Sequence, residues 1–540
     1  MSDSSTCSQL DTCAIPCPAT WSSREALRAY GWAVVVSIVI VTLCGLACVV
    51  FIKGKKENFF VGGRNMSLLF ITTMLMSQAL DSNATLGAAD LAYKFAYFDG
   101  AVLPIGLAIS LFLNAIFFAR HINRAYCLTL PDFYGRTYGS LVEILVGLIC
   151  CASFIALLAG NLVGMARILE FSFSDSENWV FLTATITLLY TGAGGLFGVA
   201  YTDLLQASMG FTGLIVAVAW CLKNFNPNVP PPSVGFVGYS YPDQDICDTY
   251  QGVPGTYQTD YCVYNEAVYG PNGVDNGAYP YGDKVVNSKG MTSQDAYAPF
   301  PNAVFYNWAT LAILGFGNLA ALDFQVRCMA ARTPSIATWA NVGAACITVV
   351  IGVMFAYMGG FMRLYYGPDS KYAEFAVDTC SQQLGLPTCA QWLPDEYAYL
   401  RLATLQMPLW LGAWSLIGIT AASMSTSNGA ILAVGSVCAH NIGRRVLRRF
   451  SAPSAGEVTD AQLLKIVRVV MIPVTFTAAC VAAWHNETGK LLIVAFDIVL
   501  AGCVAPLFAC VYGKSWVTPG GGLAGVLGGT LLRVILQVSS

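Results

Sequence analysis

Residues 68–87 read LLFITTMLMSQALDSNATLG, an apolar stretch interrupted by Asp81, Ser82 and Asn83. As a helix, such a stretch is long enough to cross about 30 Å of hydrocarbon. A charged side chain at mid-span costs roughly 2.5–3.5 kcal/mol on insertion scales, so it persists where it faces a cavity, an ion or a polar partner. Ser, Asn and Asp also make local hydrogen bonds that compete with the helix. We therefore expect the span over 68–92 to be interrupted, with freed carbonyls facing a hard cation.

The composition of the whole chain is that of a membrane protein. Of its 540 residues, 56% are hydrophobic and only 11% are charged, and the mean hydropathy is +0.59. Soluble proteins carry about a quarter charged residues. A soluble enzyme, a nucleic-acid-binding protein and a disordered scaffold are therefore excluded, and the expected partners are the lipid bilayer and a small-molecule solute. The sequence has three histidines and lacks HExxH, CxxC and a Gly-rich phosphate loop, so we expect neither a zinc hydrolase nor an ATP-driven pump.

The apolar residues form about twelve segments long enough to cross a bilayer. These segments cover 31–52, 68–92, 100–119, 141–168, 178–198, 199–222, 302–325, 337–364, 404–438, 464–484, 490–512 and 519–537. Lys and Arg residues cluster after the odd-numbered segments, which by the positive-inside rule places those loops in the cytoplasm. We therefore expect a multi-pass protein of the plasma membrane with segment 1–30 outside the cell, together with the loops 223–301 and 365–403.

The ten segments after the first divide into two groups of five, 68–222 and 302–512. An odd number of spans per group gives the two groups opposite orientations, which is the inverted-repeat plan of many secondary transporters. The spans 31–52 and 519–537 are then additional, one at each end. A count of ten can also divide into fives by chance, so the plan needs support from particular residues.

Four motifs provide that support, because they resemble the sodium/solute symporter family, which includes sodium/proline and sodium/glucose carriers. The motifs are FFVGGRNM at 59–66, LTLPDFYGR at 128–136, GGLFGVAYTDLLQ at 194–206 and AASMSTS at 421–427, in the order of the family. The resemblance covers about 55–515. It implies an all-α, LeuT-like membrane fold with an inverted five-plus-five repeat, transport rather than enzymatic activity, and a sodium ion as the coupling ion. Many members have a further span, so this sequence is either a shorter variant or lacks a C-terminal segment.

The resemblance also implies where sodium binds. In the family, backbone carbonyls of the broken first core helix and oxygens of the eighth core helix form a shared site. The matching positions in this sequence are Ala79, Ser82, Ala422, Ser425 and Thr426. Asp203 resembles an acidic residue that forms a second sodium site in some members, with Ser423 or Ser427 assisting.

Polar residues within the spans are the candidates for binding the solute. They are Asp81, Asn83, Asn161, Asn318, Asp323 and Asp497. If the three carboxylates face one cavity, a solute with an ammonium or amide group is favoured, such as urea, an amino acid or a polyamine-like compound. Two alternatives stay open: Asp81 could instead bond a neighbouring helix for packing, and Asp323 could pair with Arg327 one helical turn later.

We therefore interpret the protein as a sodium-coupled symporter that imports a small polar organic solute by alternating access, with the nitrogenous solutes urea, an amino acid or a polyamine-like compound as candidates. The alternatives are a transporter-like membrane sensor or receptor, and a symporter for sugars or monocarboxylates. Cys247 and Cys262 lie in the Gly/Pro/Tyr-rich external loop 223–301, where we expect a disulfide.

Overall fold

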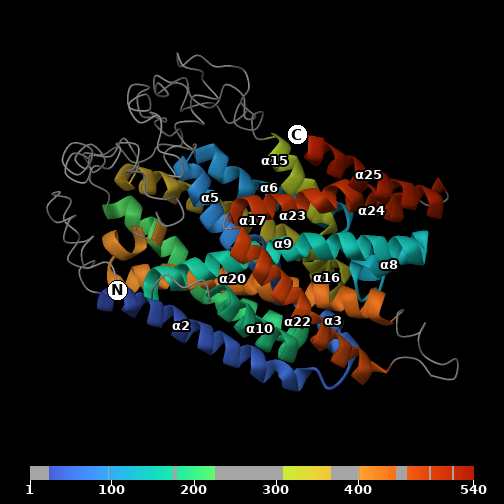
Figure 1. Cartoon of the computed structure of the whole chain (residues 1–540), viewed down its shortest axis with the longest axis horizontal. Helices are drawn as coiled ribbons and strands as arrows, with labels where there is room; N and C mark the ends of the chain where they lie inside the picture. Colours follow the sequence, from blue (N-terminus) through green and yellow to red (C-terminus); the bar gives the residue numbers. More distant parts are fainter. Residues whose placement is uncertain are drawn as a thin grey trace, which may run out of the picture.

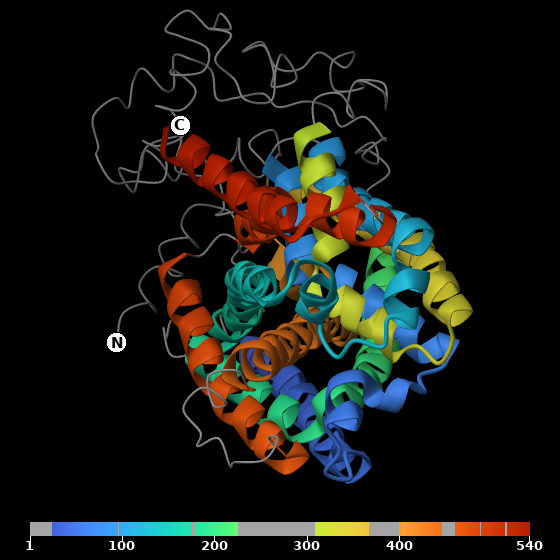
Figure 2. The ribbon, with the colours of Figure 1, turned by 90° about the vertical axis from the view of Figure 1, so that its right-hand side faces the viewer.

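The computed structural model describes residues 24–94, 97–173, 179–224, 308–366, 399–400, 402–444, 459–485, 488–513 and 516–539. This part of the chain is almost entirely helical, and most of its long helices run side by side along one direction (Figure 1). Viewed along that direction in Figure 2, the helices form a closed bundle. The predicted loop 223–301, with Cys247 and Cys262, lies almost wholly outside the described residues, so the disulfide stays a prediction.

The first half of the bundle contains eleven named helical elements within the described residues. They are α2 Arg24–Ala47, η1 Cys48–Phe51, α3 Lys56–Val61, η2 Gly62–Arg64, α4 Leu68–Ala79, α5 Ser82–Lys94, α6 Tyr97–Phe117, α7 Ala119–Arg124, α8 Leu130–Tyr138, α9 Ser140–Phe173 and α10 Trp179–Asn224. The second half contains α15 Trp308–Ala312, η4 Ile313–Gly317, η5 Asn318–Ala320, α16 Leu322–Ala330, α17 Pro334–Tyr366, η7 Leu402–Gln406, α20 Leu409–Val437, η8 Cys438–Gly443, α22 Asp460–Trp484, α23 Thr488–Val499, η9 Leu500–Val504, α24 Ala505–Tyr512 and α25 Pro519–Ser539.

Eight helices of the described part are long and apolar enough to cross a membrane, and a bent helix pair makes a ninth. α10 is assigned as one element of 46 residues, about 70 Å if it were straight. It is broken at Gly195, where φ is 51° and ψ is −150°. A Cβ atom on Gly195 would lie 2.6 Å from the Phe59 ring and 2.9 Å from the Phe59 carbonyl oxygen. Glycine therefore permits both the turn between the two expected spans and the close approach of α3.

The interruption predicted for the span over 68–92 is present. α4 ends at Ala79, Leu80 has φ −107° and ψ 54°, and α5 begins at Ser82. The first span of the second group is interrupted as well, which the sequence did not lead us to expect. There, a π-helix and a 3₁₀ turn precede Ala321, which is extended, and α16 follows at an angle of 47°. Each group of five thus begins with a broken helix.

α20 lies at the centre of this arrangement. In its most apolar stretch, 94% of the residues are buried. α20 packs against α4, α5, α9, α10 and α16. Small residues permit these close contacts: a Cβ atom on Gly210 of α10 would lie 3.2 Å from the Cα atom of Gly418. The helix that carries the Ser/Thr motif therefore contacts both broken helices.

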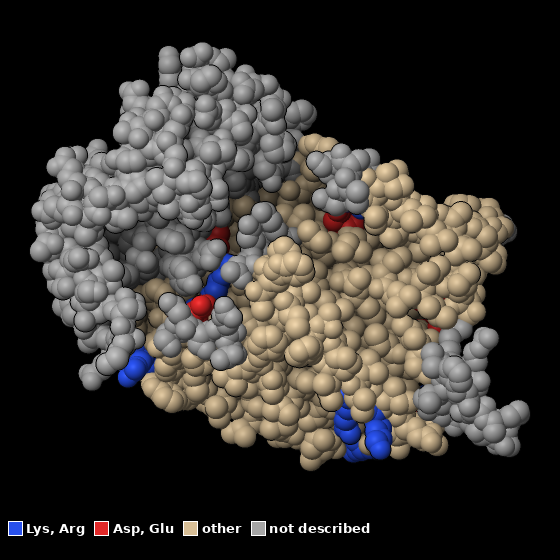
Figure 3. Space-filling model, viewed as in Figure 1, with Lys and Arg blue, Asp and Glu red and all other residues tan. Residues whose placement is uncertain are grey.

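The outside of the bundle is suited to lipid. Large apolar side chains are exposed along the outer helices, including Trp32 and Leu43 of α2 and Leu531 and Ile535 of α25. Charged side chains are sparse on the face of the described residues that Figure 3 shows. Exposed apolar surface of this extent is what a hydrocarbon environment requires, and the protein is a multi-pass membrane protein.

Candidate functional site

The C-terminus of α4 presents carbonyl oxygens to α20. The last four carbonyls of a helix lack intrahelical partners, and the helix dipole makes that end partly negative. The backbone N–H of Leu80 reaches the Met76 carbonyl at 2.9 Å. Thr426 Oγ1 contacts the Ser77 carbonyl oxygen at 3.5 Å, and both residues are buried. The α4 terminus therefore offers oxygen ligands at a buried position, next to the predicted motif of α20.

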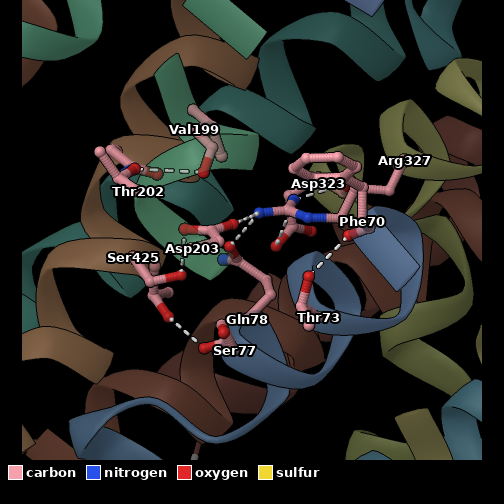
Figure 4. A network of polar contacts seen from close by, with 12 residues as sticks. Phe70, Thr73, Ser77, Gln78, Val199, Thr202, Asp203, Asp323, Arg327 and Ser425 are labelled. Carbon is pink, nitrogen blue, oxygen red and sulfur yellow. Dashed lines mark hydrogen bonds and ion pairs between the residues drawn. The ribbon is translucent and has the colours of Figure 1, made fainter. Parts of the chain in front are cut away.

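The neighbouring hydroxyl of α20 faces a different helix. Ser425 Oγ donates a hydrogen bond of 2.6 Å to Asp203 Oδ1 on α10, and both side chains are 0% exposed (Figure 4). Adjacent helical residues point about 100° apart, which explains why Ser425 and Thr426 contact different helices. Ala79 and Ala422 are also buried, on α4 and α20. Of the predicted sodium residues, these four lie on the two helices that meet here, whereas Ser82 opens α5.

The N-terminus of α5 is capped by Asp81. Its carboxylate accepts hydrogen bonds from the Ala84 backbone N–H at 2.7 Å, from Asn83 Nδ2 at 2.9 Å and from Asn161 Nδ2 of α9 at 2.7 Å. Ser82 Oγ donates to Asn161 Oδ1 at 3.1 Å. A carboxylate at a helix N-terminus is stabilised by the dipole and by the orphan N–H groups. Asp81 thus holds α5 against α9, as the packing alternative expected.

Glycines of α9 make room for this turn. A Cβ atom on Gly160 would lie 2.5 Å from Asn83 Oδ1, and one on Gly164 would overlap the Ser82 hydroxyl. Asn83 Oδ1 is buried and has no hydrogen-bond partner among the described residues. The cluster therefore keeps one acceptor that a donor group could use.

A charged cluster lies beside the α4–α20 contact (Figure 4). Arg327 of α16 is 1% exposed, and its Nη2 donates to Gln78 Oε1 of α4 at 2.7 Å. The same nitrogen is 3.6 Å from Asp203 Oδ2, and Nη1 is 3.9 Å from Asp323 Oδ2. The alternative interpretation of Asp323, as a partner of Arg327 one turn away, is the one that the structure shows. Sequence reasoning missed Ser77 and Gln78 here; the only available signal was their place just before the break.

The remaining candidates lie in other surroundings. Asn318 Nδ2 donates to Ser110 Oγ of α6 at 3.0 Å, and Asn318 Oδ1 is buried without a partner among the described residues. Asp497 of α23 forms an ion pair with Arg533 of α25. The carboxylates of Asp81, Asp323 and Asp497 thus each have their own partners.

An all-helical membrane bundle with two interrupted helices and buried polar clusters beside the breaks is the architecture of secondary transporters. Residues 59–228 match the sequence model of the sodium:solute symporter family. The chain is 24% identical to the high affinity choline transporter 1 of Homo sapiens, over 89% of this chain and 71% of that one. It is 22% identical to the sodium/proline symporter of Escherichia coli, over 92% and 87%.

The fold agrees with this likeness. A solved structure of a Na⁺-coupled sialic acid symporter superimposes with a TM-score of 0.59 at 14% identity, covering 93% of this chain and 96% of that one. Residues 59–228 thus match the sodium:solute symporter family, and the similar proteins named here are transporters rather than enzymes.

Proposed function

We propose that the protein is a sodium-coupled symporter that imports a small nitrogenous solute. The observation that carries this proposal is the carbonyl terminus of α4 against the buried hydroxyl of Thr426, with the Ser425 hydroxyl beside it on α20. The relatives add support, because one is named for choline and another for sodium and proline.

The proposed sodium ligands are the carbonyls of Ala79, Ser82 and Ala422 and the hydroxyls of Ser425 and Thr426, with the Ser77 carbonyl as a further candidate. Sodium is a hard cation and prefers such oxygen ligands. A hydroxyl has one donor proton and two acceptor lone pairs. Ser425 can therefore keep its hydrogen bond to Asp203 while a lone pair faces the ion. The partly negative end of α4 adds favourable electrostatics without a charged ligand.

The driving force is sufficient for accumulation. Sodium entry across 100 mV releases roughly 2.3 kcal/mol per charge. A tenfold sodium gradient adds about 1.4 kcal/mol, so one ion can sustain a solute ratio of several hundred.

Asp203 is proposed to take part in binding a second cation, because its carboxylate lies directly behind Ser425.

A nitrogenous solute is favoured by the acceptors that the clusters leave open. Asn83 Oδ1 and Asn318 Oδ1 are buried and lack partners among the described residues, and buried acceptors of this kind require donors. We propose Asn83 and Asn318 as the first solute contacts to examine, with Asp81, Asn161 and Asp323 behind them. Asp497 is the weakest candidate because Arg533 already neutralises it.

The proposed topology places the N-terminal segment outside the cell and the protein in the plasma membrane. The two repeats are proposed to cover 68–222 and 302–512, between the additional spans 31–52 and 519–537. The basic residues after the odd-numbered spans support this orientation.

Uptake into liposomes containing the purified protein tests the proposal. Labelled choline, proline, urea and a sugar are offered with an inward sodium gradient, or with potassium in place of sodium. We expect uptake of a nitrogenous solute only with sodium. Equal uptake in potassium would contradict sodium coupling, uptake of the sugar alone would contradict the solute class, and solute binding without uptake would favour a receptor.

A further inference from the structure

The short hydrogen bonds of Arg327 go to neutral acceptors, whereas its two carboxylate neighbours lie at longer ion-pair distances. Its Nη2 donates to Gln78 Oε1 at 2.7 Å, and its Nη1 donates to the Asp323 backbone carbonyl at 3.0 Å. The distances to the carboxylates of Asp203 and Asp323 are 3.6 Å and 3.9 Å. Structural Arg–carboxylate pairs are commonly bidentate, at about 2.7–2.9 Å. The guanidinium therefore lies between two carboxylates, at distances longer than those of a bidentate pair to either.

The cluster also lacks one positive charge. Asp203, Asp323 and Arg327 are 0–2% exposed, and when all are ionised their formal charges sum to −1. An uncompensated charge in a buried site is costly. Asp203 Oδ2 accepts no hydrogen bond from the described residues, whereas Oδ1 accepts one from Ser425. One monovalent cation at Asp203 would balance the cluster.

The surroundings leave room for the guanidinium beside the ion-binding helix. A Cβ atom on Gly429 of α20 would lie 2.6 Å from Gln78 Oε1 and 3.0 Å from Arg327 Nη2. Arg327 Nε is buried and has no partner among the described residues. Small residues at this point of α20 thus permit the guanidinium to occupy the space next to Asp203.

We infer that Arg327 is a tethered counter-ion that competes with the second cation for Asp203 and shifts to Asp323 when that cation binds. The inference rests on the proposed sodium coupling and adds a positioning residue to it. The shift moves charge along α16, the broken helix of the second repeat, and weakens its contact with α10. Cation binding at Asp203 is thereby linked to the release of α16, because the bound cation replaces the positive charge that Arg327 supplies when the site is empty.

Sodium titration of the melting temperature tests this inference without knowledge of the solute. The full-length protein in lipid nanodiscs is titrated with NaCl, and KCl replaces NaCl so that the ionic strength stays constant. No solute is added. Arg327→Gln removes the competitor. We therefore expect the sodium concentration at half-maximal stabilisation to fall about threefold or more. Asp323→Asn removes the alternative partner, so we expect that concentration to rise by a similar factor. Arg332→Gln and Asp460→Asn, at exposed positions, are matched controls and should leave it unchanged.

The double variant separates competition from a general electrostatic effect. If charge alone matters, Asp323→Asn weakens sodium binding equally with and without Arg327. Competition predicts that Asp323→Asn has little effect once Arg327 is replaced, so the double variant resembles Arg327→Gln. Additive effects of the two substitutions would overturn the inference.

The outcomes distinguish this inference from the proposed function. A wild-type protein that sodium does not stabilise more than potassium would contradict the proposed function itself. A wild-type protein that responds to sodium, with both single variants unchanged, would overturn only the role of Arg327. If Arg327→Gln does not fold, Asp323→Asn alone decides: a raised sodium requirement supports the inference, and an unchanged one overturns it.

Discussion

The two broken helices of the bundle differ in how their breaks are made. Between α4 and α5, the break carries its own polar side chains, and Asp81 caps α5 with three hydrogen bonds. Between η5 and α16, the break follows Gly315 and Gly317, and the cap of α16 has no side-chain hydrogen bond within the described part of the chain. A Cβ atom on Gly317 would overlap the Phe496 carbonyl of α23. The helix after the first break is thus capped by its own side chain, whereas the second break lies where the backbones of η4 and α23 approach closely.

Among the substitutions that test this contrast, removal of the Asp81 cap should lower the stability of the protein most. Asp81→Ala leaves the Ala84 N–H and the Asn161 amide without their acceptor, and unsatisfied buried partners of a charged group cost about 3 kcal/mol. We expect the melting temperature to fall strongly, with a smaller fall for Asp81→Asn, which keeps an acceptor oxygen. An alanine variant as stable as the wild type would show that the first break does not depend on its cap.

Gly317→Ala tests whether packing sets the second break. The added methyl group meets the backbone of α23, so we expect a loss of stability of about 2 kcal/mol from overpacking. Gly315→Ala is the matched control, because its Cβ atom would lie 3.1 Å from the Ile109 side chain, which can move. Equal melting temperatures for the two variants would contradict the packing explanation.

Asn318→Ala should have a smaller effect, because one hydrogen bond to Ser110 is lost at a net cost of about 1 kcal/mol. Ser110→Ala should cost a similar amount, and the double variant should cost little more. Thermal unfolding of the three variants measures this coupling. Fully additive losses would show that the two side chains do not stabilise the second break as a pair.

The smallest effect is expected in η8, which directly follows α20, the helix against which both broken helices pack. His440 Nε2 lies 3.2 Å from Asp132 Oδ2 of α8, and Asn441 donates to Oδ1 at 2.8 Å. Burial raises the pKa of Asp132, but the hydrogen bond and charge of His440, with bonds from Leu128 and Asn441, outweigh it and hold this pKa below its usual value. A lowered pKa stabilises the fold above the unfolded-state pKa of about 4, and this stabilisation is lost as the pH falls.

Melting temperatures of the wild type and of Asp132→Asn at pH 7 and at pH 4 check this prediction. The free energies of unfolding of the two proteins should differ by about 1 kcal/mol or less at pH 7, and the difference in melting temperature should shrink towards pH 4. A difference that grows in acid would show that the carboxylate is not stabilised by these contacts.

The sequence predicted the helical class, the break in 68–92 and the helix pair that carries the proposed sodium residues, because each has a local signal. Asp81, Ser82 and Asn83 are helix-breaking residues at mid-span, and the Ser/Thr motif is continuous in the chain. The second break and the contacts of Gln78 with Arg327 join residues 249 positions apart, which no local pattern records. The same limit explains why the sequence did not show that Asp497 is paired with Arg533, from another helix.

The most direct test of the account is the sodium dependence of Ser425→Ala and Thr426→Ala. Both hydroxyls are proposed to bind the ion against the α4 terminus, so each variant should need more sodium for half-maximal uptake, with a smaller change in maximal rate at saturating sodium. Ser423→Ala, whose hydroxyl bonds the Ile419 carbonyl on its own helix, is the control and should change less. Wild-type sodium dependence in both Ser425→Ala and Thr426→Ala would contradict the proposed site.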